Sequence, residues 1–227
     1  MVISVCKSDY FIDRSREVFL SCIAERSNKQ AEDNFYSQKF LDVFIFATTA
    51  LEAFINERIS ISLLICKRRL ALNDPVNQNT VDDDRFHIKI LNRMKKENLR
   101  EKYLELPRLL WNTKLEKNEP PYHDFEILVK IRNDIIHYKM PFYDEENFEP
   151  SWVSELSKKG FFMNKPVIVP PEPLNEKKRI WIEEICTLKS ARWAHNTTCA
   201  TIKQFCRMSK GVIQLTIDDY ADYFAEL

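Results

Sequence analysis

Glycine occurs only twice in the 227 residues of this chain, at Gly160 and Gly211. β-Sandwiches, β-barrels and phosphate-cradling loops all need glycine, either for tight turns or for close approach of the backbone. An α-helical fold tolerates the scarcity, because glycine is a poor helix residue. The ten prolines are bunched, so that long stretches without proline remain between them. The sequence therefore predicts an all-α protein.

The spacing of apolar residues divides the chain into several predicted helices. They are expected over 13–28, 33–72, one or two within 85–115, then 122–139 and 176–208. Residues 141–175 contain six prolines and are predicted to be an inserted, mostly irregular segment, because they are too short to bury a core of their own. Their aromatic residues are expected to anchor the segment on the helices. The whole chain, 1–227, is predicted to be one domain.

The net charge of the chain is zero, since 34 basic residues balance 34 acidic ones. A protein that binds nucleic acid non-specifically usually carries a net positive field. Any contact with RNA would therefore need a local basic patch. Three short basic runs are candidates, at 67–69, 93–96 and 177–179, but they are expected to be solvated helix ends.

The six cysteines include no CxxC pair and do not cluster with histidines in the sequence. This spacing predicts reduced thiols in the core and no metal or cofactor. His87, His123 and His195 show no metal-ligand spacing either. The acidic run 82–84 is expected to be a solvated loop.

The start of the chain lacks a basic region followed by a long apolar run, so no signal peptide is expected. Residues 44–65 are apolar, but Glu52, Glu57 and Arg58 lie among them, and each charge would be costly in lipid. The sequence predicts a buried core helix there. A cytoplasmic protein without membrane contact is expected.

The stretch 127–139, ILVKIRNDIIHYK, carries the functional hypothesis. One side of this predicted helix has an ordinary apolar core stripe. On the opposite side, Val129 and Ile136 lie between Arg132 on one edge and the pair Asn133 and His137 on the other. A side that faces solvent would not need two apolar residues. We therefore expect a partner on this face, and in a modest domain the partner is often a second copy.

Arg132, Asn133 and His137 together suit phosphodiester chemistry. A neutral imidazole can take the proton of a ribose 2′-hydroxyl, since its unperturbed pKa is about 6.5. A guanidinium grips a phosphate and stabilises the charge that develops on it. Asn133 lies four residues before His137, where it can orient the imidazole or bind a phosphate oxygen. Attack of the 2′-hydroxyl on its own phosphate needs no metal and leaves a 2′,3′-cyclic phosphate.

Arg132-Asn133-x-x-x-His137 resembles the RX4–6H motif of HEPN domains, including the polar residue after the arginine. Residues 50–57, ALEAFINE, are similar to the helix that HEPN proteins pack against the motif helix. The stretch from Ala191 onward is similar, more weakly, to their closing helix. The resemblance covers 35–72, 122–140 and 180–208, about half of the chain.

The resemblance implies an antiparallel helical bundle that forms a homodimer through the motif helix. Two Arg/His pairs then meet in one cleft and form a composite ribonuclease site, as in toxins, phage-defence proteins and RNA-processing factors. It implies an RNA substrate and allows an antitoxin or defence-system partner. One branch of toxins has a tyrosine two residues after the histidine. Here Tyr138 is adjacent and Lys139 takes that place, so regulation by tyrosine modification is not implied.

Glu52 lies in the ALEAFINE stretch among apolar residues, where an unpaired carboxylate would be costly. It is expected either to pair with Arg132 or Arg58 or to lie on an exposed strip. We hypothesise that it orients Arg132 without touching the substrate. The neighbouring Asn56 and Glu57 are expected to be capping or surface groups.

Three functions follow from these patterns. The first is a metal-independent endoribonuclease of the HEPN type with Arg132, Asn133 and His137 in the site. The second is a non-catalytic HEPN module that dimerises or binds a nucleotide or a protein. The third is a helical scaffold in which the motif occurs by chance. The neutral charge favours the last two, and the intact trio favours the first.

Overall fold

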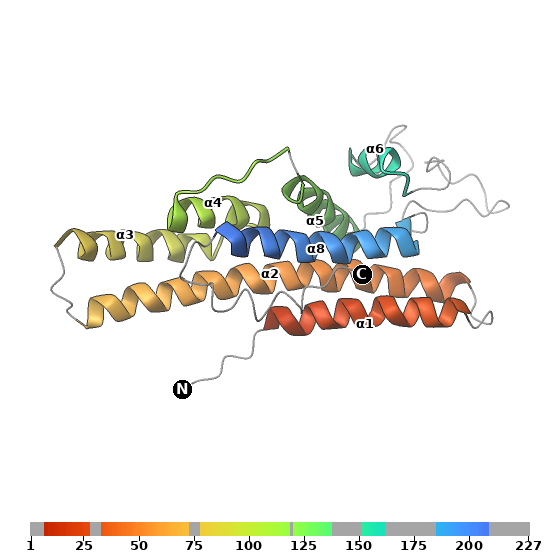
Figure 1. Ribbon diagram of the computed structural model, residues 1–227, viewed down its shortest axis with the longest axis horizontal. Coiled ribbons are helices and arrows are strands. Elements are labelled where there is room, and N and C mark those ends of the chain that lie inside the picture. The colour runs from red at the N-terminus through yellow and green to blue at the C-terminus, as the bar shows by residue number, and fades with distance from the viewer. Residues whose placement is uncertain are drawn as a thin grey trace.

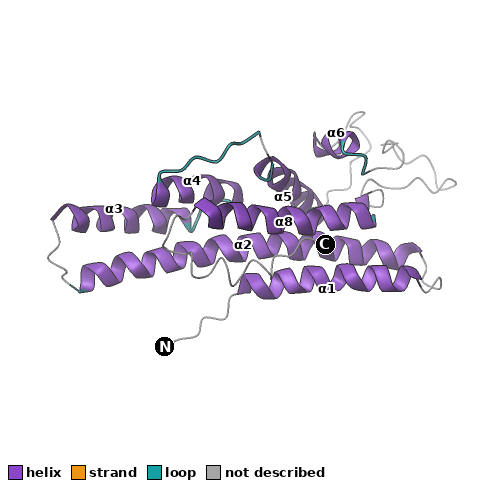
Figure 2. Ribbon diagram, in the orientation of Figure 1, coloured by secondary structure: helices purple, strands orange, loops and turns teal. Residues whose placement is uncertain are grey.

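The computed structural model describes residues 7–27, 33–72, 78–118, 120–137, 151–161 and 185–208. These residues form seven α-helices and contain no strand (Figures 1 and 2), which confirms the all-α prediction. The helices are α1 (Lys7–Ser27), α2 (Asp33–Ala71), α3 (Gln78–Met94), α4 (Leu99–Trp111), α5 (Tyr122–Ile136), α6 (Ser151–Lys158) and α8 (Leu188–Met208).

Helix α2 is the central element of the bundle. Its 39 residues span roughly 58 Å at 1.5 Å per residue, and α1, α3, α4, α5 and α8 all pack against it. Helix α1 runs antiparallel to α2, and α8 lies along α2 on another side (Figure 1). Contact on several sides explains the dense apolar sequence of α2, because a helix covered around its circumference needs no wide polar face.

An aromatic cluster at the centre of the core joins three helices. The ring centroid of Phe205 on α8 lies 5.4 Å from Phe54 on α2, and 5.7 Å and 5.0 Å from Tyr103 and Trp111 on α4. The Tyr103 hydroxyl donates a hydrogen bond of 3.2 Å to the Leu51 carbonyl. Burial raises the pKa of the Tyr103 phenol well above its ordinary value. This buried hydroxyl therefore stays a donor and fixes α4 against α2.

Helix α1 begins at Lys7, earlier than the start predicted near residue 13. Glu57 of α2 explains the difference. Its carboxylate accepts hydrogen bonds from the backbone N–H groups of Lys7 (2.6 Å) and Ser8 (3.2 Å) and from the Ser8 hydroxyl (2.8 Å). A carboxylate at a helix N-terminus satisfies free N–H groups and complements the helix dipole. Glu57 is thus a capping group, supplied from a distant part of the sequence.

Other predicted boundaries differ from those of the structure. The run 82–84 is helical rather than a loop, because α3 begins at Gln78, and Asp84 is buried against α2. Helix α5 ends at Ile136 rather than at 139, and residues 138–150 lie outside the described part of the chain. The last helix begins at Leu188, after a break at 186–187, whereas its predicted start near 176 lies outside the described residues.

The predicted insertion, 141–175, is described only over 151–161, and that part is not irregular, because it contains α6. Trp152 and Phe161 are buried there. The Trp152 indole N–H donates to Oδ2 of Asp134 on α5 at 2.6 Å. Anchoring by aromatic residues is therefore confirmed for these two side chains.

The apolar stretch 44–65 lies within α2, where helices on several sides cover it. Across the described ranges, no helix combines the length and the apolar character needed to cross a bilayer.

Candidate functional site

Arg132 lies on α5 where this helix packs against α2. Its Nη2 donates to Oε2 of Glu52 at 3.2 Å, and its Nη1 donates to Oδ1 of Asn133 at 3.1 Å. The side chains of Arg132 and Glu52 are 27% and 44% exposed, so the pair lies at the edge of the core. Of the two cations expected for Glu52, the fold thus brings Arg132 to it. The guanidinium of Arg58 lies instead over the Phe54 ring, 4.9 Å from its centroid.

The Glu52–Arg132 pair matters for geometry more than for stability. A partly exposed ion pair contributes at most about 1 kcal/mol to folding. However, two acceptors on different helices fix the plane of the guanidinium fork. The remaining nitrogen, Nε of Arg132, is buried and has no hydrogen-bond partner among the described residues.

A pocket of about 380 Å³ opens beside Arg132. This volume lies within the range of small-molecule sites. Three segments form its wall: Thr48 and Glu52 of α2; Glu97, Asn98, Leu99, Arg100 and Lys102 at the start of α4; and Val129, Arg132 and Asn133 of α5. Three of these side chains are cationic and two are anionic.

Lys102 is a residue of this pocket that the sequence analysis missed. It is only 6% exposed, and its Nζ donates to Oδ1 of Asn56 at 2.9 Å. Within the described part of the chain, no carboxylate lies within 4 Å of this ammonium. A buried cation without a counter-charge favours an anion in the adjoining space. One sequence signal could have identified it, since Lys102 interrupts the apolar stripe formed by Leu99, Tyr103 and Leu106.

The first turn of α4 is held in place from both sides. Asn98 caps the helix, because its Oδ1 accepts from the backbone N–H of Glu101 at 3.0 Å. Arg100 pairs with Glu126 of α5, and its Nε lies 3.1 Å from Oε1 of that residue. Hydrogen bonding to Glu126 raises the pKa of the Arg100 guanidinium above its ordinary value. Arg100 is thus committed to this pair, as Arg132 is to Glu52, so Lys102 is the cation of the wall without a carboxylate partner among the described residues.

His137 follows the last residue of α5 and is exposed. Its backbone N–H donates to the Asn133 carbonyl at 2.8 Å. Among the described residues, the amide of Asn133 bonds Arg132 and makes no hydrogen bond to the imidazole. A single chain therefore groups Arg132, Asn133 and Glu52, and it places His137 outside the pocket wall, at the end of the same helix.

The sequence predicts that Val129 and Ile136 form an apolar face of α5 for a partner, and only one of them is available at the surface. Val129 is buried by its own chain and lines the pocket, so it needs no partner. Ile136 is 48% exposed, next to His137. The expectation that Val129 marks a surface for a partner is therefore wrong, and only the end of α5 offers an apolar contact.

Two other histidines have contacts that indicate structural roles. His195 is buried, with Nδ1 3.2 Å from the Ser15 hydroxyl and Nε2 3.5 Å from Sγ of Cys199. His123, at the start of α5, lies with Nε2 3.7 Å from a carboxylate oxygen of Glu155. His195 is thus a hydrogen-bonded core residue, and His123 belongs to a surface pair.

Comparisons of the chain with protein-family models, with curated proteins and with solved structures found no match. A function has to be inferred from the site itself.

Proposed function

We propose that this chain is a metal-independent endoribonuclease of the HEPN type. The observation that carries the proposal is the fixed guanidinium of Arg132, held by Glu52 and Asn133 beside a pocket that Lys102 also lines. His137 follows five residues later, directly after the end of α5. The packing of the ALEAFINE stretch of α2 against α5 supports the proposal, because the resemblance to HEPN domains implies this pairing of helices.

The reaction uses groups that the chain supplies. The imidazole of His137 takes the proton of the ribose 2′-hydroxyl, and the 2′-oxygen forms a bond to the adjacent phosphorus. The bond from phosphorus to the 5′-oxygen breaks, and that oxygen receives a proton. The products are a 2′,3′-cyclic phosphate and a 5′-hydroxyl. Arg132 stabilises the negative charge on the phosphoryl oxygens, and Asn133 keeps the guanidinium oriented toward them.

The site is completed by a second copy of the chain. His137 and Ile136 are exposed together at the end of α5, and an isologous contact through this helix end brings two Arg132/His137 pairs into one cleft. One imidazole then serves as the base, and the partner subunit's His137 serves as the acid. The molar mass in solution, measured by light scattering, is expected to be twice that of one chain.

A second function is favoured by Lys102. Its buried ammonium and Arg132 both face the pocket, where they can hold the phosphates of a nucleotide without any cleavage. In this case His137 has no chemical role, since it lies outside the pocket wall. The alternative is a non-catalytic HEPN module that binds a nucleotide.

RNA cleavage in the presence of EDTA separates the two functions. The wild-type protein is expected to cut RNA without metal and to leave 2′,3′-cyclic phosphate and 5′-hydroxyl ends, detected by end-specific labelling and mass spectrometry. A folded dimer that leaves varied RNAs intact contradicts the nuclease. If such a protein binds ATP or GTP, and Lys102→Ala abolishes the binding, the second function holds.

Glu52→Gln is expected to lower the cleavage rate by up to about 100-fold, because small errors in the position of a catalytic group cost that much. The measurement is the single-turnover rate, together with the same substitution in an Arg132→Ala background. There it should have little further effect, since two residues that act as a unit are not additive. Glu17→Gln, in the exposed pair with Arg14, is the control. Equal losses from Glu52→Gln in both backgrounds would show that it does not act through Arg132.

A further inference from the structure

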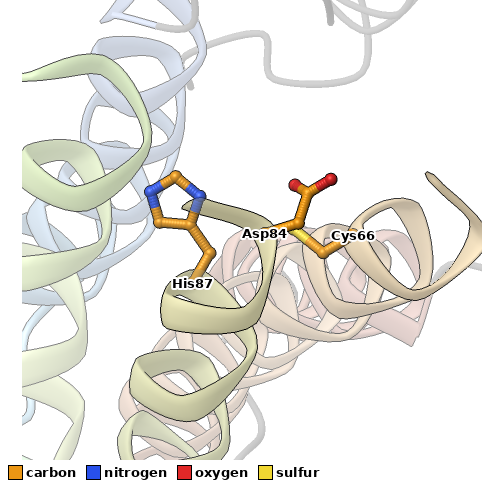
Figure 3. Close-up of side chains that lie close together, drawn as sticks. All are labelled: Cys66, Asp84 and His87. Atoms are coloured by element: carbon orange, nitrogen blue, oxygen red, sulfur yellow. The ribbon is translucent and has the colours of Figure 1, made fainter. Parts of the chain in front are cut away.

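A sulfur, an oxygen and a nitrogen ligand lie together where α2 packs on α3. Cys66 belongs to α2, whereas Asp84 and His87 lie one turn apart on α3. Their ligand atoms are all within 4.8 Å of one another. Figure 3 shows the Asp84 carboxylate beside the Cys66 thiol, with the His87 imidazole on the same side of α3. We propose that Cys66, Asp84 and His87 form a binding site for Zn²⁺.

The chemistry of the three donors selects the metal. A thiolate and an imidazole suit zinc, whereas Mg²⁺ and Ca²⁺ prefer oxygen ligands alone. Zinc bonds of about 2.0–2.3 Å place neighbouring tetrahedral ligands roughly 3.3–3.8 Å apart. The present spacing therefore requires small side-chain rotations and no movement of the helices. On binding, the thiol gives its proton to solvent. Three protein ligands leave the fourth position to water.

The Asp84 carboxylate is nearly buried, and its pairing with a cation is weak. Its side chain is only 8% exposed, and its ion-pair partner among the described residues is Arg69, whose Nη1 lies 3.7 Å away. This distance is too long for a hydrogen bond. Arg69 is largely exposed, so it can move into solvent when a metal takes its place. Burial and a hydrogen bond to Asp84 raise the pKa of the Cys66 thiol above its ordinary value.

The zinc site is separate from the proposed nuclease site. Cys66 is 14 residues from Glu52 along α2, which corresponds to roughly 21 Å. A metal bound there joins the C-terminal part of α2 to the middle of α3 and holds the two helices together. It plays no part in the cleavage reaction, so either proposal can fail without affecting the other.

Cobalt and zinc titrations of the reduced wild-type protein test the site. One Co²⁺ per chain is expected to bind, with a thiolate-to-cobalt charge-transfer band and the visible bands of tetrahedral cobalt. Zn²⁺ should displace the cobalt, since it binds such sites more tightly, and should raise the melting temperature. Mg²⁺ should do neither.

Variants assign the ligands. His87→Gln changes a partly exposed residue and should preserve the fold while lowering affinity for Zn²⁺ at least about 100-fold, since loss of an outer-shell partner alone costs 10- to 100-fold. Cys66→Ser should remove the sulfur band. Arg69→Ala should tighten binding, because it removes the competing cation from Asp84. His123→Gln is the matched control and should bind like the wild type. Absence of the sulfur band in the wild type, or unchanged affinity in His87→Gln, would overturn the proposal.

Discussion

Replacing His137 by alanine is expected to lower the rate of RNA cleavage by about 10²- to 10⁴-fold, the range that a general base contributes. The imidazole is exposed beyond the end of α5, so its loss leaves no cavity. The free energy of unfolding should change by no more than about 0.5 kcal/mol. Single-turnover cleavage in EDTA measures the first effect, and urea unfolding measures the second. A large loss of rate without loss of stability would assign a chemical role to His137.

His123→Ala provides the matched control, because His123 is a partly exposed histidine at the opposite end of α5 from His137. Its removal should leave the cleavage rate within about twofold of wild type, as is usual for a surface change away from a site. The same two variants should be compared by light scattering. A His137→Ala protein that cleaves RNA as fast as the wild type would exclude the proposed mechanism, whatever its oligomeric state.

Phe205→Ala is expected to destabilise the protein by about 3–5 kcal/mol, the usual cost of emptying a buried aromatic site. The Phe205 ring contacts Phe54, Tyr103 and Trp111, which come from two other helices. These helices cannot close the cavity without giving up their remaining contacts with one another, so relaxation should recover little of the loss. Urea unfolding monitored by circular dichroism gives the change in free energy.

Phe86→Ala is the control for this second prediction. Phe86 is the same residue type, but its side chain lies on α3 and is 57% exposed, so its removal should cost less than about 0.5 kcal/mol. Similar losses for the two variants would mean that the aromatic cluster does not organise the core. If Phe205→Ala also abolishes cleavage at a temperature where the variant is folded, the cluster positions α2 relative to α5 as well.

The long helices could be predicted because their signals are local. Near-absence of glycine excludes most β architectures, and the apolar density of 33–72 requires a helix that is covered around its circumference. The observed α2 ends one residue from its predicted end. The start of α1 could not be predicted, because Glu57, the group that caps Lys7 and Ser8, is about 50 residues away in sequence. Local helix propensity does not depend on a capping group so far away in the sequence.

Part of the candidate site could be predicted in the same way. Arg132 and Asn133 lie on one short helix and His137 directly follows its end, so their spacing alone places them near one another. The cost of an unpaired carboxylate predicted a cation beside Glu52 but left Arg132 and Arg58 as alternatives, and the structure brings Arg132 to it. Lys102 was missed because α4 is separate from both helices. The role expected for Val129 was wrong, since a helical wheel cannot tell a face covered by a partner from one covered by the same chain.

The sequence by itself determined the helical class, the central helix and the identity of the chemical groups on α5, because composition and periodicity act over a few turns of one helix. The tertiary structure alone decided which groups meet. Because α2 packs on α5, the Glu52 carboxylate lies beside Arg132. Because α4 packs beside both helices, the buried Lys102 side chain lines the same pocket. The contact of α2 with α3 gathered Cys66, Asp84 and His87, although no spacing in the sequence suggests a metal site. Such groupings depend on how the helices are placed relative to one another. This placement is set by the burial of apolar side chains throughout the core, which no short stretch of sequence determines.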